Sequence, residues 1–162
     1  MNSPSSPDLI AQELPRLIER MHRRFLDVVR IELSRHRIND ISPAQAMMLV
    51  MIGDEEMSVR DLIERGYYLG SNASYNLKDL VEGGYAERQT AARDRRSAMV
   101  KVAPKGRTIL EILHKLNAHM AEPLMKSDTE AHDMESAVRA LRRLERRWSD
   151  NVQFTSDGRE ES

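Results

Sequence analysis

The chain has 162 residues, enough for one domain with a hydrophobic core, and its 40% hydrophobic and 31% charged content is typical of a helical protein. The absence of cysteine excludes disulfides, cysteine-zinc sites and thiol-based oxidation switches, and no stretch approaches the ~20 apolar residues of a membrane span. The first eight residues also lack the pattern of an export signal, so we expect a cytoplasmic protein with no membrane partner. The net charge of the chain is −1.

The first predicted element is a long helix. Residues 1–6, rich in Ser and Pro, predict a flexible end, and Ser6-Pro7 is typical of an N-cap followed by proline in the first turn. Apolar residues then recur at helical spacing up to about Arg35. They are Leu14, Leu17, Ile18, Met21, Phe25, Val28 and Val29.

Two shorter helices are expected next, each introduced by a serine. Ser42-Pro43-Ala44-Gln45 has the spacing of a capping box and opens a helix through Ile52. Ser58 stands three residues before Asp61 and repeats the device. The second helix is expected to position the one that follows it.

Residues 71–82 predict a helix with one apolar and one polar face. Ser71 is expected to be its N-cap, and Gly83-Gly84 tolerates the positive φ that ends a helix. At about 100° per residue, the apolar face consists of Ala73, Leu77, Leu80 and Val81. The polar face carries groups that read base edges or phosphates, namely Ser71, Asn72, Ser74, Tyr75, Asn76 and Lys78. Asp79 also falls there and would repel phosphate unless it lies beyond the groove or accepts a hydrogen bond from cytosine.

Two strands are predicted after the glycines, at Tyr85–Gln89 and Ala98–Val102. The polar segment 90–97 between them is too long for a two-residue hairpin and should project as a wing. Its charged residues are Arg93, Asp94, Arg95 and Arg96. A guanidinium can enter the narrow, negative minor groove of duplex DNA, and we expect Asp94 to orient Arg96 for that contact. An exposed turn is often charged, so the wing alone is weak evidence.

The charge is distributed unevenly along the chain. Residues 57–107 contain ten Lys and Arg against six Asp and Glu, whereas the remaining residues contain fifteen against twenty. A local basic excess supports contact with phosphate in this segment.

Two further helices are predicted at the C-terminal end. One runs from Pro104 to about Lys126, and a capping box at Ser127–Glu130 opens the last helix, whose apolar stripe reaches Trp148. Residues 151–162 are polar and predict a second flexible end. The apolar stripes of residues 1–36 and 108–150 are expected to pair with a second copy of the chain, although they could also close a bundle within one chain.

The combined pattern resembles the MarR family of bacterial transcriptional regulators. Three motifs carry the resemblance: the helix ending LVEGGY, the triplet Asp94-Arg95-Arg96, and Pro104-Lys105-Gly106. It implies a mainly α (α+β winged helix) fold, in which a winged helix-turn-helix module over residues 42–107 is flanked by N- and C-terminal dimerisation helices within a single domain of residues 1–162. Many members carry Thr or Ser before the position of Pro104; here it is Ala103, which removes a cap worth ~1 kcal/mol.

The resemblance also implies a function. It predicts a homodimeric repressor on a palindromic operator in double-stranded DNA, released by a small-molecule effector that lodges between the dimer helices and the DNA module. Activation is equally permitted by the residues. The predicted DNA-binding residues are Ser71, Asn72, Ser74, Tyr75, Asn76, Lys78, Arg93, Asp94, Arg95 and Arg96.

Two other function classes were weighed. An enzyme is disfavoured, since the chain has no HExxH, GxSxG, Walker or GxGxxG motif, and we expect no catalytic residue, metal or cofactor. The alternative is a winged-helix protein-protein interaction module without specific DNA binding, because winged helices also serve that role. The arginines of the wing argue against it.

Overall fold

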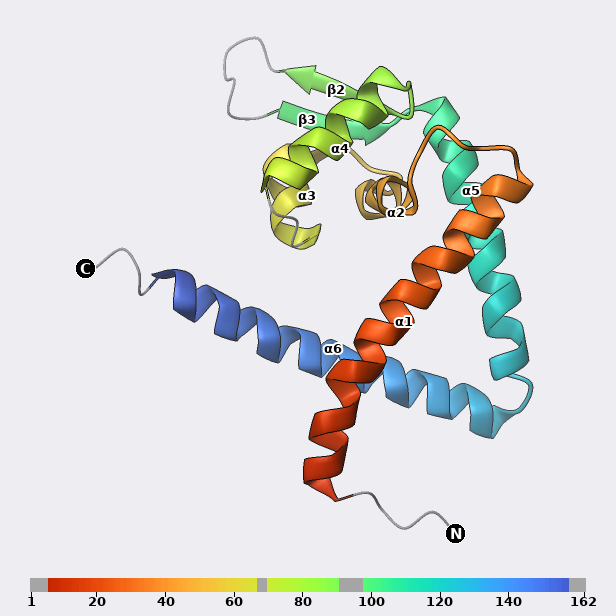
Figure 1. The fold of residues 1–162 in the computed structure, drawn as a ribbon, viewed down its shortest axis with the longest axis vertical. Helices are drawn as coiled ribbons and strands as arrows, with labels where there is room; N and C mark the ends of the chain where they lie inside the picture. Colours follow the sequence, from red (N-terminus) through yellow and green to blue (C-terminus); the bar gives the residue numbers. More distant parts are fainter. Residues whose placement is uncertain (1–5, 67–69, 91–97, 158–162) are drawn as a thin grey trace. The chain divides into compact units, whose positions relative to one another are not determined.

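The computed structural model describes residues 6–66, 70–90 and 98–157 and is mainly α-helical with a small antiparallel sheet, as predicted (Figure 1). It divides into two compact units, Met1–Lys115 and Leu116–Ser162. The division falls inside the fifth helix.

The first helices begin where their serines predicted. The Oγ of Ser6 accepts a hydrogen bond from the Leu9 amide at the start of α1 (Pro7–Arg35). At α2 (Pro43–Ile52) the capping box is complete, with Ser42 and Gln45 each accepting from the other's backbone amide. Ser58 accepts from the Asp61 amide and opens α3 (Val59–Gly66). These contacts satisfy amides that the first turn of a helix leaves unpaired.

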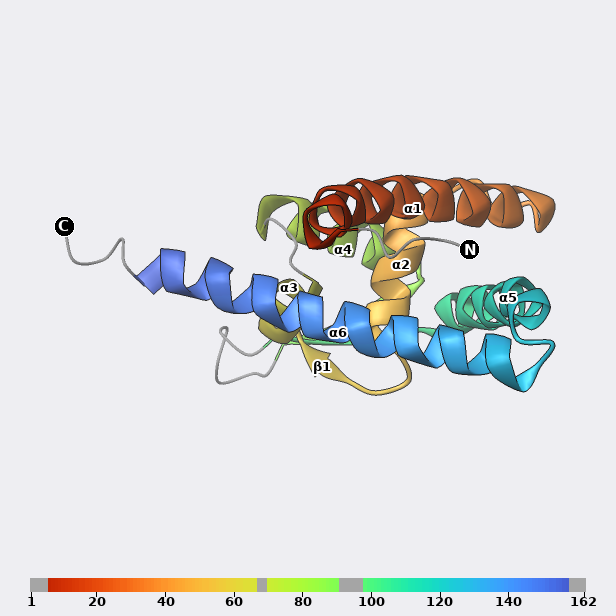
Figure 2. The ribbon, with the colours of Figure 1, turned by 90° about the horizontal axis from the view of Figure 1, so that it is seen from below.

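The sheet has three strands, one more than predicted. Its order is β1 (Met57–Ser58), β3 (Ala98–Val102), β2 (Ala86–Thr90), with all neighbours antiparallel. A two-residue strand is too short to leave an alternating pattern, so β1 could not be found from the sequence. Figure 2 shows β1 leading directly into α3.

The core of the first unit lies around α2. This helix packs against α1, α3, α4 (Gly70–Glu82) and β3 (Figures 1 and 2). The largest fully buried side chains come from six elements of this unit and are Val29, Leu33, Met48, Leu49, Leu62, Leu80, Val100, Ile109 and Leu113. The helix-turn-helix part therefore has a complete hydrophobic core within one chain.

The C-terminal helices differ from the prediction at two boundaries, the end of α5 and the end of α6. Helix α5 (Pro104–Ala121) starts at the predicted residue without a side-chain cap from Ala103, but it ends earlier than the predicted Lys126. A 3-10 turn follows at Glu122–Leu124, because Pro123 has no amide hydrogen to continue the α-helix. Helix α6 (Asp128–Asp157) continues beyond the predicted end near residue 150.

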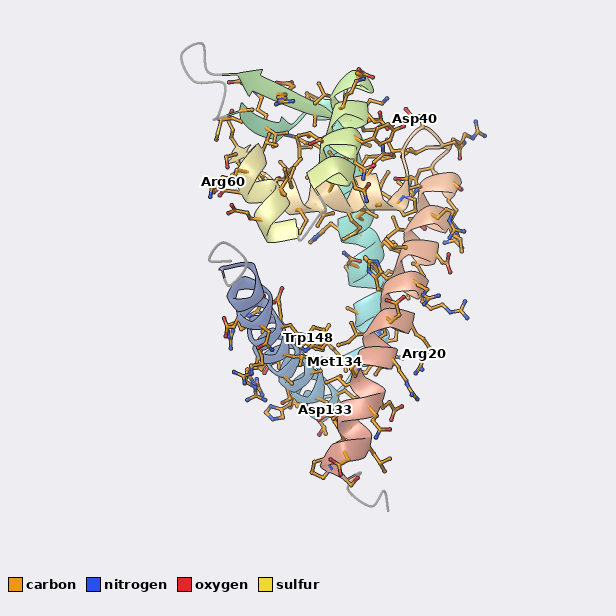
Figure 3. The ribbon with its side chains drawn as sticks, turned by 60° about the vertical axis from the view of Figure 1, so that its left-hand side comes forward. Arg20, Asp40, Arg60, Asp133, Met134 and Trp148 are labelled. Carbon is orange, nitrogen blue, oxygen red and sulfur yellow. The ribbon has the colours of Figure 1, made fainter. Side chains whose placement is uncertain are left out.

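The second unit leaves its apolar residues uncovered. The predicted capping box is present, since Ser127 and Glu130 accept from each other's amides. However, no described side chain of α6 up to Asn151 is buried. The large apolar side chains exposed along this unit are Met120, Leu124, Met125, Met134, Val138, Leu141 and Trp148. Figure 3 shows Met134 and Trp148 projecting from the same side of α6.

Candidate nucleic-acid interface

Helix α4 separates its apolar and polar residues as the periodicity predicted. Ala73, Leu77 and Leu80 are at most 3% exposed, whereas Tyr75 is 66% exposed. A tyrosine that reaches this far into solvent beside polar neighbours can contact a base or a phosphate. The buried face fixes the helix on the core, so the exposed face is presented in one orientation.

Not every predicted residue of α4 is equally placed. Asn72, Ser74 and Lys78 are exposed, but Asn76 is only partly exposed, because it lies at the edge of the buried face. Lys78 Nζ lies 3.6 Å from a carboxylate oxygen of Glu82, one turn further along, so its ammonium group is shared between that carboxylate and solvent.

The expected N-cap role of Ser71 is wrong. The helix begins at Gly70, so Ser71 lies inside its first turn rather than before it. Serine is common near helix N-termini, but its presence alone does not fix which residue begins the first turn.

Asp79 has a structural role that the sequence did not reveal. Its carboxylate accepts a hydrogen bond from Gln45 Nε2 at 3.2 Å, and Gln45 is only 8% exposed. Gln45 is also the residue that completes the capping box of α2. Asp79 therefore ties α4 to α2, which explains an acidic residue on a helix expected to approach phosphate.

Strands β2 and β3 precede and follow the predicted wing in the sequence. Strands β2 and β3 pair from Ala86 opposite Val102 to Thr90 opposite Ala98. Lys101 and Glu87 form a 3.0 Å ion pair across the two strands. The four predicted wing residues, Arg93, Asp94, Arg95 and Arg96, lie outside the described residues, between the paired ends of the strands.

A side-chain network connects the end of α4 to the start of α5. Lys105 Nζ lies 3.0 Å from the carbonyl oxygen of Gly83 and 3.1 Å from Asp40 Oδ2, and it stands 3.9 Å from the centroid of the Tyr85 ring. The Tyr85 hydroxyl donates to Asp40 Oδ1 at 2.7 Å. We call Asp40, Gly83, Tyr85 and Lys105 the α4–α5 junction.

The charges of the junction support one another. Hydrogen bonds from Tyr85 and Lys105 lower the pKa of the Asp40 carboxyl below its ordinary value. The hydrogen bond to Asp40 raises the pKa of the Lys105 ammonium, and burial together with Asp40 raises the pKa of the Tyr85 hydroxyl. At neutral pH the junction therefore contains a carboxylate, an ammonium group and a neutral phenol.

Backbone contacts also hold the α4–α5 junction together. The Ala103 amide donates to the carbonyl oxygen of Tyr85 at 3.0 Å. A Cβ at Gly106 would lie 2.1 Å from that oxygen and 2.7 Å from Cγ1 of Val102, so no side chain fits there. This close approach explains the glycine in the Pro104-Lys105-Gly106 motif. Asp40, by contrast, stands 45 residues before Tyr85 and gave no signal in the sequence.

The described residues contain neither a candidate metal site nor a candidate membrane span. No group of three or more His, Cys, Asp or Glu there could hold a metal ion. Within the same residues, no helix combines the length and the apolar character that crossing a membrane requires.

Comparisons with known proteins agree with this geometry. Residues 39–97 match the model described as the MarR family. The transcriptional activator of exopolysaccharide II synthesis, ExpG, from Rhizobium meliloti (strain 1021), is 40% identical over 142 residues, which cover 88% of this chain and 73% of that protein.

Solved structures share the fold. FabT from Streptococcus pneumoniae in complex with DNA superimposes with a TM-score of 0.72 at 20% identity, over 85% of this chain and 99% of that chain. MarR from Staphylococcus aureus in complex with salicylate and kanamycin gives a TM-score of 0.66 at 18% identity, over 84% and 92%.

Proposed function

This chain belongs to the MarR family of transcriptional regulators, and from that premise we propose that it binds a palindromic DNA operator as a homodimer through α4 and the wing. Members of this family are regulators rather than enzymes. The observation that carries the proposal is the polar face of α4, with Tyr75 66% exposed, on a helix whose other face is buried.

In the proposed complex, α4 of each subunit lies in a major groove. Asn72, Tyr75 and Asn76 face base edges, with Asn76 contributing least because it is only partly exposed. Phosphates are contacted by Ser71, Ser74 and Lys78. The wing places Arg95 or Arg96 in the flanking minor groove, with Arg93 near the backbone and Asp94 orienting Arg96.

Homodimerisation is supported by the uncovered apolar residues of the terminal helices. On α1, Leu9, Ile10 and Met21 are each more than 50% exposed, and Val138 on α6 is 47% exposed. Apolar residues repeated along a helix but left in water are typical of a face that a partner covers. A second copy of the same chain supplies the two recognition helices that a palindrome needs.

An occupied operator is compatible with either repression or activation. The predicted repressor role and the name of the R. meliloti relative, an activator, are compatible with one binding mode, because blocking polymerase and displacing another protein both require only an occupied operator. A small-molecule effector is supported by the salicylate and kanamycin in the S. aureus structure. It would act by preferring one separation of the two α4 helices.

The test is a selection of bound duplexes from a randomised pool. The proposal predicts enrichment of two inverted half-sites whose centres lie about 10 bp apart, on one side of the duplex. Tyr75→Ala should change or abolish the enriched sequence, whereas Glu111→Gln, an exposed change on α5, should leave it intact. If the wild-type chain enriches no sequence, the protein-protein interaction module becomes the better account of the winged helix.

A further inference from the structure

The α4–α5 junction lies where the recognition helix ends. Gly83 is the first residue after α4, and its amide donates to the carbonyl of Asp79 at 2.8 Å. The last carbonyls of a helix carry partial negative charge and lack partners within the helix. Lys105 supplies an ammonium group to one of them from the first turn of α5.

The junction also joins three segments that are distant along the chain. Asp40 belongs to the connection between α1 and α2, Tyr85 follows the glycine turn after α4, and Lys105 belongs to α5. One carboxylate oxygen accepts from Tyr85 and the other accepts from Lys105. Figure 3 shows Asp40 in the connection between α1 and α2.

The ion pair of the junction is too exposed to contribute much to folding. The side chains of Lys105 and Asp40 are 50% and 58% exposed, and ion pairs in such positions contribute little to the free energy of unfolding. The core of α4 is supplied by Ala73, Leu77 and Leu80 instead. The Lys105–Asp40 pair therefore has little to do for stability, but it links the turn after α4 to the first turn of α5.

We propose that Lys105, with Asp40 and Tyr85, is a positioning residue that sets the orientation of α4 relative to α5 and thereby adjusts the dimer to the spacing of two half-sites. The inference rests on the proposed function. Helix α5 runs from the first unit into the second, which carries apolar residues assigned to the proposed dimer. In such a dimer, a change in the orientation of α4 on α5 would change the distance between the two α4 helices. A single half-site imposes no such demand.

The first arm of the test does not involve DNA. Hydrogen exchange is measured on the amides of Gly83, Gly84 and Tyr85 in the wild type and in Lys105→Met. Because Lys105 holds the Gly83 carbonyl, these amides should exchange about fivefold faster or more in the variant, while the midpoint of urea unfolding stays within error. Lys115→Met removes the same charge from an exposed site on α5 and should change neither quantity.

The second arm compares two duplexes, a full operator selected with the wild type and the same DNA with one half-site scrambled. Lys105→Met should bind the full operator about threefold more weakly, but the single half-site with unchanged affinity within error, as expected for a change in coupling between two sites. The variant should also discriminate less than the wild type between the selected operator and operators whose half-site spacing is changed by one or two base pairs. Tyr85→Phe, which keeps the buried ring, should act in the same direction.

Each outcome has a separate meaning. Equal losses on both duplexes would make Lys105 a direct phosphate ligand and overturn the inference, as would unchanged exchange at residues 83–85. If Lys115→Met loses as much affinity for the full operator, the effect of Lys105→Met is one of net charge, and the inference is also overturned. If the wild type binds no duplex, the proposed function fails, and the exchange arm alone decides whether the junction holds α4.

Discussion

The two units of this chain differ in how they bury apolar residues. In the first unit, residues from α1 to α5 close around α2, and side chains such as Leu49 and Leu80 have no exposed surface. In the second unit, only Leu116 is buried among the described residues, although apolar residues recur along the whole of α6. The elements around α2 have a closed core, whereas the start of α1 and the described length of α6 leave large apolar residues in water.

This difference indicates separate tasks. A module that must present α4 in a fixed orientation benefits from a core closed within a single chain, because packed interiors deform little. Apolar residues left in water along a helix are typical of a face that a partner covers, which is the role proposed for α6.

Leu80→Ala removes a fully buried side chain from the underside of α4. We expect the free energy of unfolding to fall by about 3 kcal/mol, through lost burial and a cavity that closes only in part. Urea denaturation followed by circular dichroism measures the change, and the loss should be the same when the protein concentration is raised tenfold. A loss below ~1 kcal/mol would show that α4 does not rest on a closed core.

Leu141→Arg places a charge on the apolar side of α6, where Leu141 is 40% exposed in the single chain. Because a dimer would bury that charge without a partner, we expect association to weaken about 100-fold or more. Sedimentation equilibrium gives the dissociation constant. Arg143→Gln, on the opposite side of the helix, serves as the matched control and should remain dimeric; a Leu141→Arg dimer of unchanged affinity would contradict the assignment of α6.

Arg96→Ala removes a guanidinium from the wing. DNA binding should weaken by ~1 to 3 kcal/mol while the dimer stays intact, because the contact proposed for Arg96 is with the minor groove and the proposed dimer uses the terminal helices. Anisotropy titration and sedimentation report the two quantities on the same sample. An unchanged DNA affinity would remove Arg96 from the interface.

Lys78→Ala has the smallest expected effect. Lys78 is exposed and already lies near Glu82, so its loss should reduce affinity modestly and equally for all sequences. The slope of log affinity against log salt should flatten by about one ion, since one phosphate contact is lost. A loss confined to one base position would instead make Lys78 a base reader.

The sequence predicted those parts of the fold that depend on local chemistry. Ser6, Ser42, Ser58 and Ser127 mark helix starts because a hydroxyl caps amides three residues away, and the apolar face of α4 follows from its period. The winged-helix fold and the family follow from motifs that lie within one stretch of chain. Helix α4 shows the limit of such rules, since it begins at Gly70 and not after the serine expected to cap it.

Contacts between distant segments could not be predicted. The bond from Gln45 to Asp79 and the bond from Tyr85 to Asp40 depend on how α2, α4 and the α1–α2 connection meet in space. Nothing in the local pattern around Asp79 distinguishes a tether from a base contact. For the same reason the sequence identified Lys105 only as part of a motif, and its partners came from the structure.

Fluorescence anisotropy tests whether this chain binds specific DNA as a dimer through α4. Labelled duplexes from the region upstream of its own gene are titrated at two salt concentrations, with random duplex as competitor. The account predicts binding that survives the competitor and weakens steeply with salt, because specific contacts add to phosphate contacts. Binding to upstream DNA that is no tighter than to random duplex, at both salt concentrations, would contradict it.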